Sequence, residues 1–198
     1  MPNIHGKAYA MNTISPMKPW KTYILRFFFF VWRHYKPLGN GLVELSFIHF
    51  ARWVIVPRYT FPRLSEQQPK NDLQYDYLLF FSNFNGTWNQ YIDAFSAVLF
   101  SGLNLIWRWS EKFPGSRPVM PFKNFIVRGQ VETDYYYTAY PHAATNDVKA
   151  AHRVQAAFDD FEKLSNGMPP AKFAEAYQQF LVKVQCDLGE TGQAPVGT

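Results

Sequence analysis

The sequence predicts an α+β fold, a ferredoxin-like four-stranded antiparallel sheet with helices on one face and an extra aromatic helix at the N-terminus. Two segments rich in aromatic and β-branched residues end at Pro or Gly clusters, as strands do. Later segments repeat apolar residues at three- and four-residue spacing, the period of a helix. Hydrophobic residues make up 47% of the chain and charged residues 18%. This balance excludes an intrinsically disordered chain.

The first expected element is a helix built on the aromatic run from Tyr23 to Trp32. Its apolar stretch is far shorter than the ~20 residues that a membrane-spanning helix needs. Aromatic residues bracketed by cations are typical of a helix that lies at a membrane surface, or that docks on a protein. We therefore interpret residues 1–41 as a basic aromatic docking segment. Its docking residues are Lys21, Arg26, Phe27, Phe28, Phe29, Phe30, Trp32 and Arg33.

Two strands are expected next, over residues 42–56 and 75–84. The first is apolar on both faces, so something should cover each face: the aromatic helix, a second subunit or a ligand. We expect the two strands to pair antiparallel.

Helices and further strands fill the second half. Thr87 and Gln90 form a capping-box pattern that opens a helix to about residue 99, and residues 103–109 read as a second short helix. Residues 125–128 and 131–140 read as short strands, and helices follow over 145–164 and from Pro170. This order lacks one strand of the ferredoxin-like fold, which residues 42–56 supply in a permuted arrangement. The domain spans 42–188, and 189–198 form a flexible tail.

The stretches SFIHFARWVIVPR and YLLFFSNFNGTWNQYIDAF resemble uncharacterised bacterial proteins with a ferredoxin-like, dimeric α+β barrel domain. Those proteins are distantly similar to dye-decolorising peroxidases and chlorite dismutases. The resemblance covers roughly residues 42–164. It implies a homodimer and, as an alternative function, haem held by a histidine from a helix in the second half, here His152. The Gly-x-x-Asp-Gly motif of the peroxidases is missing, because Asn replaces the acid in residues 83–86.

Few residues are candidates for chemistry. His49 and His152 are the candidate catalytic histidines, against the simpler reading of a core and a boundary histidine. Arg52, Tyr135 and Tyr137 are candidates for a ligand pocket. Arg52 would alternatively pair with Glu132 or Asp134, and the tyrosines would alternatively pack across strands. One cysteine and no metal-ligand spacing predict no disulfide and no metal site.

Charge separates along the chain. Residues 1–64 contain nine Lys or Arg and one acid, while the rest carries eleven bases and fourteen acids. This asymmetry points to an anionic partner for the N-terminal segment, either phospholipid headgroups or nucleic acid. No nucleic-acid-binding signature accompanies it, which disfavours nucleic acid. We expect a cytoplasmic, non-catalytic accessory or interaction protein without a cofactor, which docks on a partner subunit or a membrane surface. The alternative is an oxidoreductase that uses haem or a hydrophobic substrate.

Overall fold

The computed structural model describes residues 3–35, 47–61, 63, 65–69 and 73–188. It has an α+β fold, which confirms the predicted class. The elements in chain order are β1 (Ile4–His5), β2 (Ala8–Met17), α1 (Pro19–His34), β3 (Ile48–Val56), the 3-10 turn η2 (Arg58–Thr60), β4 (Asp76–Asn85), α3 (Trp88–Val98), α4 (Phe100–Trp107), α5 (Val119–Gly129), β5 (Gln130–Val131), α6 (Thr145–Ser165) and α7 (Pro170–Val184).

The strands form an open antiparallel sheet in the order β1-β2-β4-β3, and β5 also pairs with β2. The predicted antiparallel pairing of the two apolar strands is confirmed by β3 and β4, whose register joins Trp53 to Phe80 and Arg52 to Phe81. Residues 42–46 of the first predicted strand lie outside the described residues, as does the predicted tail.

The sequence did not predict β2, although it is a central strand of the sheet. It pairs with β4 along its whole length, from Ala8 opposite Asn85 to Met17 opposite Asp76. Two of its buried positions are the polar residues Thr13 and Ser15, and Pro16 lies on the opposite face. The sequence of β2 therefore lacks the alternation of apolar and polar residues that marks a strand. The predicted boundary at residue 41 separates β2 from its pairing partner. Residues 8–17 therefore belong to the domain.

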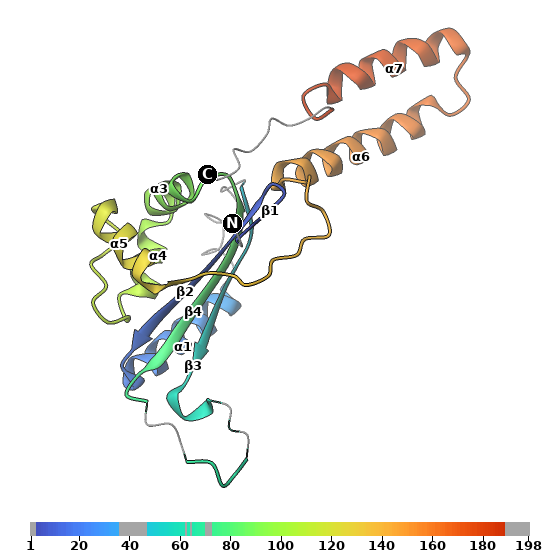
Figure 1. The fold of residues 1–198 in the computed structure, drawn as a ribbon. Helices are drawn as coiled ribbons and strands as arrows, with labels where there is room; N and C mark the ends of the chain where they lie inside the picture. The colour runs from blue at the N-terminus through green and yellow to red at the C-terminus, as the bar shows by residue number, and fades with distance from the viewer. Residues whose placement is uncertain (1–2, 36–46, 62, 64, 70–72, 189–198) are drawn as a thin grey trace.

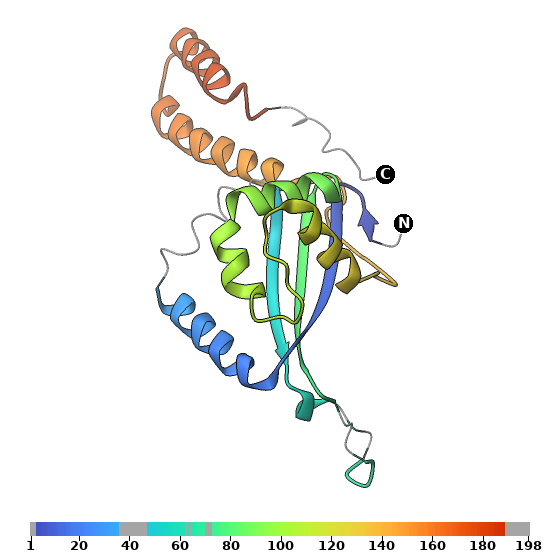
Figure 2. The same cartoon turned by 90° about the vertical axis from the view of Figure 1, so that its left-hand side faces the viewer.

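Helices α3, α4 and α5 cover one face of the sheet (Figure 2). The core between them is aromatic: Phe80 and Phe84 of β4 meet Tyr91 and Phe95 of α3 and Trp107 of α4. The capping box that opens α3 is confirmed, since Thr87 Oγ1 accepts from Gln90 N and Gln90 Oε1 accepts from Thr87 N.

The two strands predicted over 125–128 and 131–140 are wrong. Residues 119–129 form helix α5, β5 has only two residues, and residues 132–144 run without regular structure. Val119, Phe122 and Ile126 share one helical face against the core, and this period outweighs the strand preference of Ile126 and Val127.

The second face of the sheet is covered in part. Residues from the 132–144 segment reach β2 and β4, where Asn12 Nδ2 donates to Thr133 Oγ1 at 2.8 Å and Asn83 contacts the Tyr136 hydroxyl. Phe50 and Val54 of β3 stay exposed on this face. Helix α1, one of the three covers that the sequence offered, packs on the helical side instead, where Phe29 contacts Trp53.

Helices α6 and α7 form an antiparallel hairpin that projects away from the sheet (Figure 1). Its interior is an aromatic cluster in which Phe161 lies 5.2 Å from Phe180 and 5.5 Å from Phe173, measured between ring centroids. Arg153 of α6 also pairs with Asp187, which follows α7, through Nε at 3.1 Å from both carboxylate oxygens. The hairpin is thus held mainly by contacts within itself.

Candidate functional site

Helix α1 is fixed to the body by its inner face. Pro19 occupies its first turn, where the missing N–H is tolerated. Thr22 Oγ1 donates to Asp76 Oδ2 at 2.6 Å in a buried contact, and Asp76 Oδ1 also accepts from Arg58 N at 2.9 Å. Leu25 is fully buried beside them. A hydrogen bond to a buried carboxylate is among the stronger ones, so this contact sets the position of the helix.

Aromatic and ionic contacts extend this attachment. The Phe29 ring lies 6.3 Å from Trp53 of β3, and the Phe28 ring lies 6.1 Å from Trp109. Lys21 Nζ pairs with Glu111 Oε1 at 2.8 Å. The hydrogen bond from Lys21 is the main cause that lowers the pKa of the Glu111 carboxyl. Together these contacts turn one side of α1 away from solvent.

The opposite side of α1 carries four exposed aromatic residues, which we term the outer stripe: Trp20, Tyr23, Phe27 and Phe30. Their exposed fractions are 58%, 67%, 62% and 61%. The spacing of three, four and three residues places them along one line of the helix. Arg26 and Arg33 are exposed next to this line, and α1 contains no acidic residue.

The predicted docking residues divide between the two sides of α1. Arg26, Phe27, Phe30 and Arg33 lie on the exposed side. Lys21, Phe28, Phe29 and Trp32 contact the protein's own body. The sequence reasoning missed Trp20 and Tyr23, although their spacing from Phe27 and Phe30 was a signal that could have found them.

A pocket of about 230 Å³ lies between α1, β3 and the α3–α4 pair. Trp32 of α1 and Trp53 of β3 form part of its wall, and Leu99, Gly102 and Ile106 form much of the rest. None of the residues predicted to bind a ligand lines it.

The predicted pocket residues lie elsewhere. Arg52 is exposed on β3, where its guanidinium lies 4.9 Å from the centre of the Phe81 ring. Within the described part of the chain, no ion pair joins it to Glu132 or Asp134. Tyr135 and Tyr137 are 81% and 68% exposed in the irregular segment, so they do not pack across strands.

His49 lies at a β-bulge, where the register shifts between Ile48 and Phe50. Its imidazole is in hydrogen-bond contact with Asn85, while part of its surface stays exposed. Partial burial lowers its pKa and outweighs the hydrogen bond, which raises it. His152 is exposed on α6, in the projecting hairpin. The two candidate histidines therefore occupy different parts of the fold.

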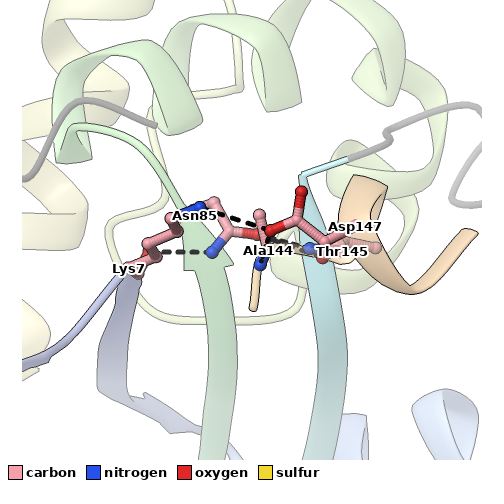
Figure 3. A network of polar contacts seen from close by, with 5 residues as sticks. All are labelled: Lys7, Asn85, Ala144, Thr145 and Asp147. Carbon is pink, nitrogen blue, oxygen red and sulfur yellow. Dashed lines mark hydrogen bonds and ion pairs between the residues drawn. The ribbon is translucent and has the colours of Figure 1, made fainter. Parts of the chain in front are cut away.

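The polar contacts around Asn85 form a structural joint (Figure 3). Asn85 Nδ2 donates to Lys7 O at 2.8 Å, and Asn85 Oδ1 accepts from Thr145 N at 3.0 Å. Asp147 Oδ2 accepts from Ala144 N at 2.7 Å and pairs with Lys7 Nζ at 3.3 Å. The Asn85 amide and the Asp147 carboxylate thus connect the start of α6 to the ends of β2 and β4. We assign this cluster a structural role.

Comparisons with protein-family models, with curated proteins and with solved structures give no match. In the residues that the structure describes, no helix combines the length and hydropathy needed to cross a bilayer. The same residues contain no cluster of three or more side chains suited to a metal ion.

Proposed function

We propose that the protein is a non-catalytic interaction protein that docks through the outer stripe of α1 onto an anionic membrane surface. The carrying observation is the exposure of Trp20, Tyr23, Phe27 and Phe30 on one line of a helix whose other side is fixed to the body. Exposed aromatic residues are unfavourable in water, and a contiguous apolar patch marks an interaction surface.

The chemistry of the stripe favours lipid over protein as the occupant. Trp and Tyr rings partition to the headgroup depth of a bilayer, where one part of the ring is apolar and another part meets water. Arg26 and Arg33 beside the stripe complement anionic headgroups, each contributing about 1 kcal/mol at such a surface. The lack of acidic residues in α1 removes repulsion from the same surface.

Vesicle flotation tests this proposal. The full chain should float with vesicles that contain anionic phospholipid and only weakly with vesicles of neutral phosphatidylcholine. The double variant Phe27→Ser/Phe30→Ser should lose most of this binding, because both rings are exposed and their removal leaves the core intact. Tyr135→Ser/Tyr137→Ser is the matched control, since these rings lie outside α1 and are more exposed than Phe27 and Phe30.

Charge is tested separately with Arg26→Gln/Arg33→Gln, which should weaken anionic vesicle binding roughly tenfold or more. Lys172→Gln/Arg128→Gln removes two exposed cations elsewhere and should bind as the wild type does. Flotation that is unchanged in the aromatic variant overturns the proposal. If the chain self-associates through the outer stripe and does not float with vesicles, the membrane proposal is overturned. The partner would then be a second copy of this chain.

We also propose two properties that follow from the resemblance of the sequence. The first is the ferredoxin-like relationship, with its homodimer. The second is the oxidoreductase alternative, which visible absorption would test: a Soret band lost in His152→Ala would replace the docking role with haem chemistry.

A further inference from the structure

We infer that the pocket between α1, β3 and the α3–α4 pair binds a single acyl chain with an anionic head. This inference goes beyond the docking role and does not require it, because a free fatty acid could occupy the pocket without any membrane. The acyl chain is the shared chemistry of a fatty acid and a membrane lipid.

The lining selects an apolar occupant. Among the described residues that form the wall, Ser101 alone has a side chain ending in a hydroxyl, and none of them is charged. The remaining wall is aromatic or aliphatic, with Trp32, Trp53, Leu99 and Ile106 as its larger members. Removing a methylene group from water into such surroundings contributes about 0.8 kcal/mol, whereas an ionised head group would lose its hydration there.

The volume limits the size of the occupant. About 230 Å³ exceeds the roughly 150 Å³ that suffices to hold benzene in an apolar cavity. It is smaller than the roughly 300–1,000 Å³ of sites for drug-sized molecules. A flexible chain can place several methylene groups in this space and leave the remainder outside.

A cation is held at the α3–α4 junction, two residues of which line the pocket. Arg117 donates from a terminal nitrogen to the carbonyl of Ala97 at 3.0 Å, and its guanidinium lies 4.7 Å from the centre of the Phe100 ring. Ala97 and Phe100 flank Val98 and Leu99, which line the pocket. A guanidinium has five donors, so those that remain can bind a carboxylate or a phosphate.

Gly102 of α4 provides the variant that closes the pocket. A Cβ added there would lie 3.7 Å from Cη2 of Trp32, an ordinary contact. Gly102→Ala therefore fits without strain. Because that Cβ already contacts Trp32, the three further carbons of Gly102→Leu should occupy the pocket. If the leucine variant does not fold, the smaller Gly102→Val replaces it.

The experiment titrates the full chain with decanoate below its micelle concentration and follows tryptophan fluorescence, since Trp32 and Trp53 line the pocket. We expect saturable binding by the wild type and, to within twofold, by the control Lys172→Gln/Arg128→Gln, whose side chains do not line the pocket. Gly102→Leu should bind at least tenfold more weakly. Arg117→Gln should weaken decanoate binding several-fold and leave decanol binding unchanged. Absence of saturable binding, or equal binding by Gly102→Leu, overturns the inference.

A second arm distinguishes the sources of the chain. Wild-type protein is incubated with vesicles and separated from them, and its bound lipid is measured by mass spectrometry. Lipid carried off by the wild type, and not by Gly102→Leu, identifies the bilayer as the source. Decanoate binding without lipid extraction identifies a free fatty acid. Gly102→Leu should still float with anionic vesicles, and Phe27→Ser/Phe30→Ser should still bind decanoate, so failure of one proposal is separable from failure of the other.

Discussion

At the scale of single residues, buried polar groups hold the elements together at their ends. Asp76 is only 3% exposed and uses both carboxylate oxygens, one for Thr22 of α1 and one for the backbone of Arg58. Asn85 does the same at the other end of β4, where its amide serves the β1–β2 turn and the start of α6. Both ends of one strand thus organise the segments around it.

The Asp76→Ala variant should lower the free energy of unfolding by about 1–3 kcal/mol, because it leaves a buried hydroxyl and a backbone N–H without an acceptor. Urea denaturation measures this loss. Asp134→Ala removes an exposed carboxylate and should change stability by less than about 0.5 kcal/mol. Equal midpoints for the two variants would show that Asp76 does not fasten α1.

The ion pair of Lys21 with Glu111 should make stability depend on pH. The Glu111 pKa is lowered in the folded protein, so the unfolded chain binds the proton more tightly. The stabilisation is therefore complete above the ordinary glutamate pKa and is lost as pH falls through the lowered value. Glu111→Gln should unfold at a lower temperature than wild type at pH 7, with the difference shrinking below about pH 4. Glu132→Gln, an exposed carboxylate, is the control, and a gap that persists at pH 3 would contradict this account.

At the scale of elements, the hairpin of α6 and α7 should be the least stable part of the described fold. Its buried hydrophobic residues are few, namely Ala150, Ala157, Phe161 and Val184, while β2 and β4 lie in the centre of the sheet. Local opening free energy follows such burial. In hydrogen exchange, amides of α7 should exchange well before those of β4. Equal protection in both would show that the hairpin unfolds only with the whole domain.

Local signals predicted elements where neighbouring residues alone decide the structure. The Thr87–Gln90 capping box and the apolar spacing behind it predicted α3, and Pro170 predicted the start of α7. The sequence misassigned α5, because the β-branched pair at 126–127 suggested a strand while packing of Phe122 and Ile126 on the core decided for a helix. It missed β2, because that strand is specified by long-range pairing with β4.

The candidate site was predictable in part for the same reason. Composition alone identified α1 as aromatic and basic, which is a local property. Which of its residues point outward depends on contacts with Asp76, Trp53 and Trp109, all distant in sequence. The sequence reasoning therefore included inward-facing Phe28 and Phe29 among the docking residues and left out Trp20 and Tyr23.

At the scale of the whole molecule, the separation of charge should make membrane docking depend on salt. The attraction of an exposed arginine is screened beyond the Debye length, which is about 10 Å at 0.1 M salt and about 3 Å at 1 M. Flotation with anionic vesicles should fall several-fold between 0.1 and 0.5 M NaCl, and the residual binding should still require the aromatic rings of the outer stripe. The weak binding to neutral vesicles should not change with salt concentration. Salt-independent binding to anionic vesicles would leave Arg26 and Arg33 without a role.

The position of β2 has a consequence for how the protein is made. Met17 pairs with Asp76 and Ala8 with Asn85, so the strand that leaves the ribosome early finds its neighbour only after β4 has been synthesised. Until then its backbone donors and acceptors can pair with other chains, and such long-range pairing is slow to form. A nascent chain stalled before Asn85 should consequently be open to protease and to chaperones over residues 8–17, and shielding should begin only once β4 has emerged.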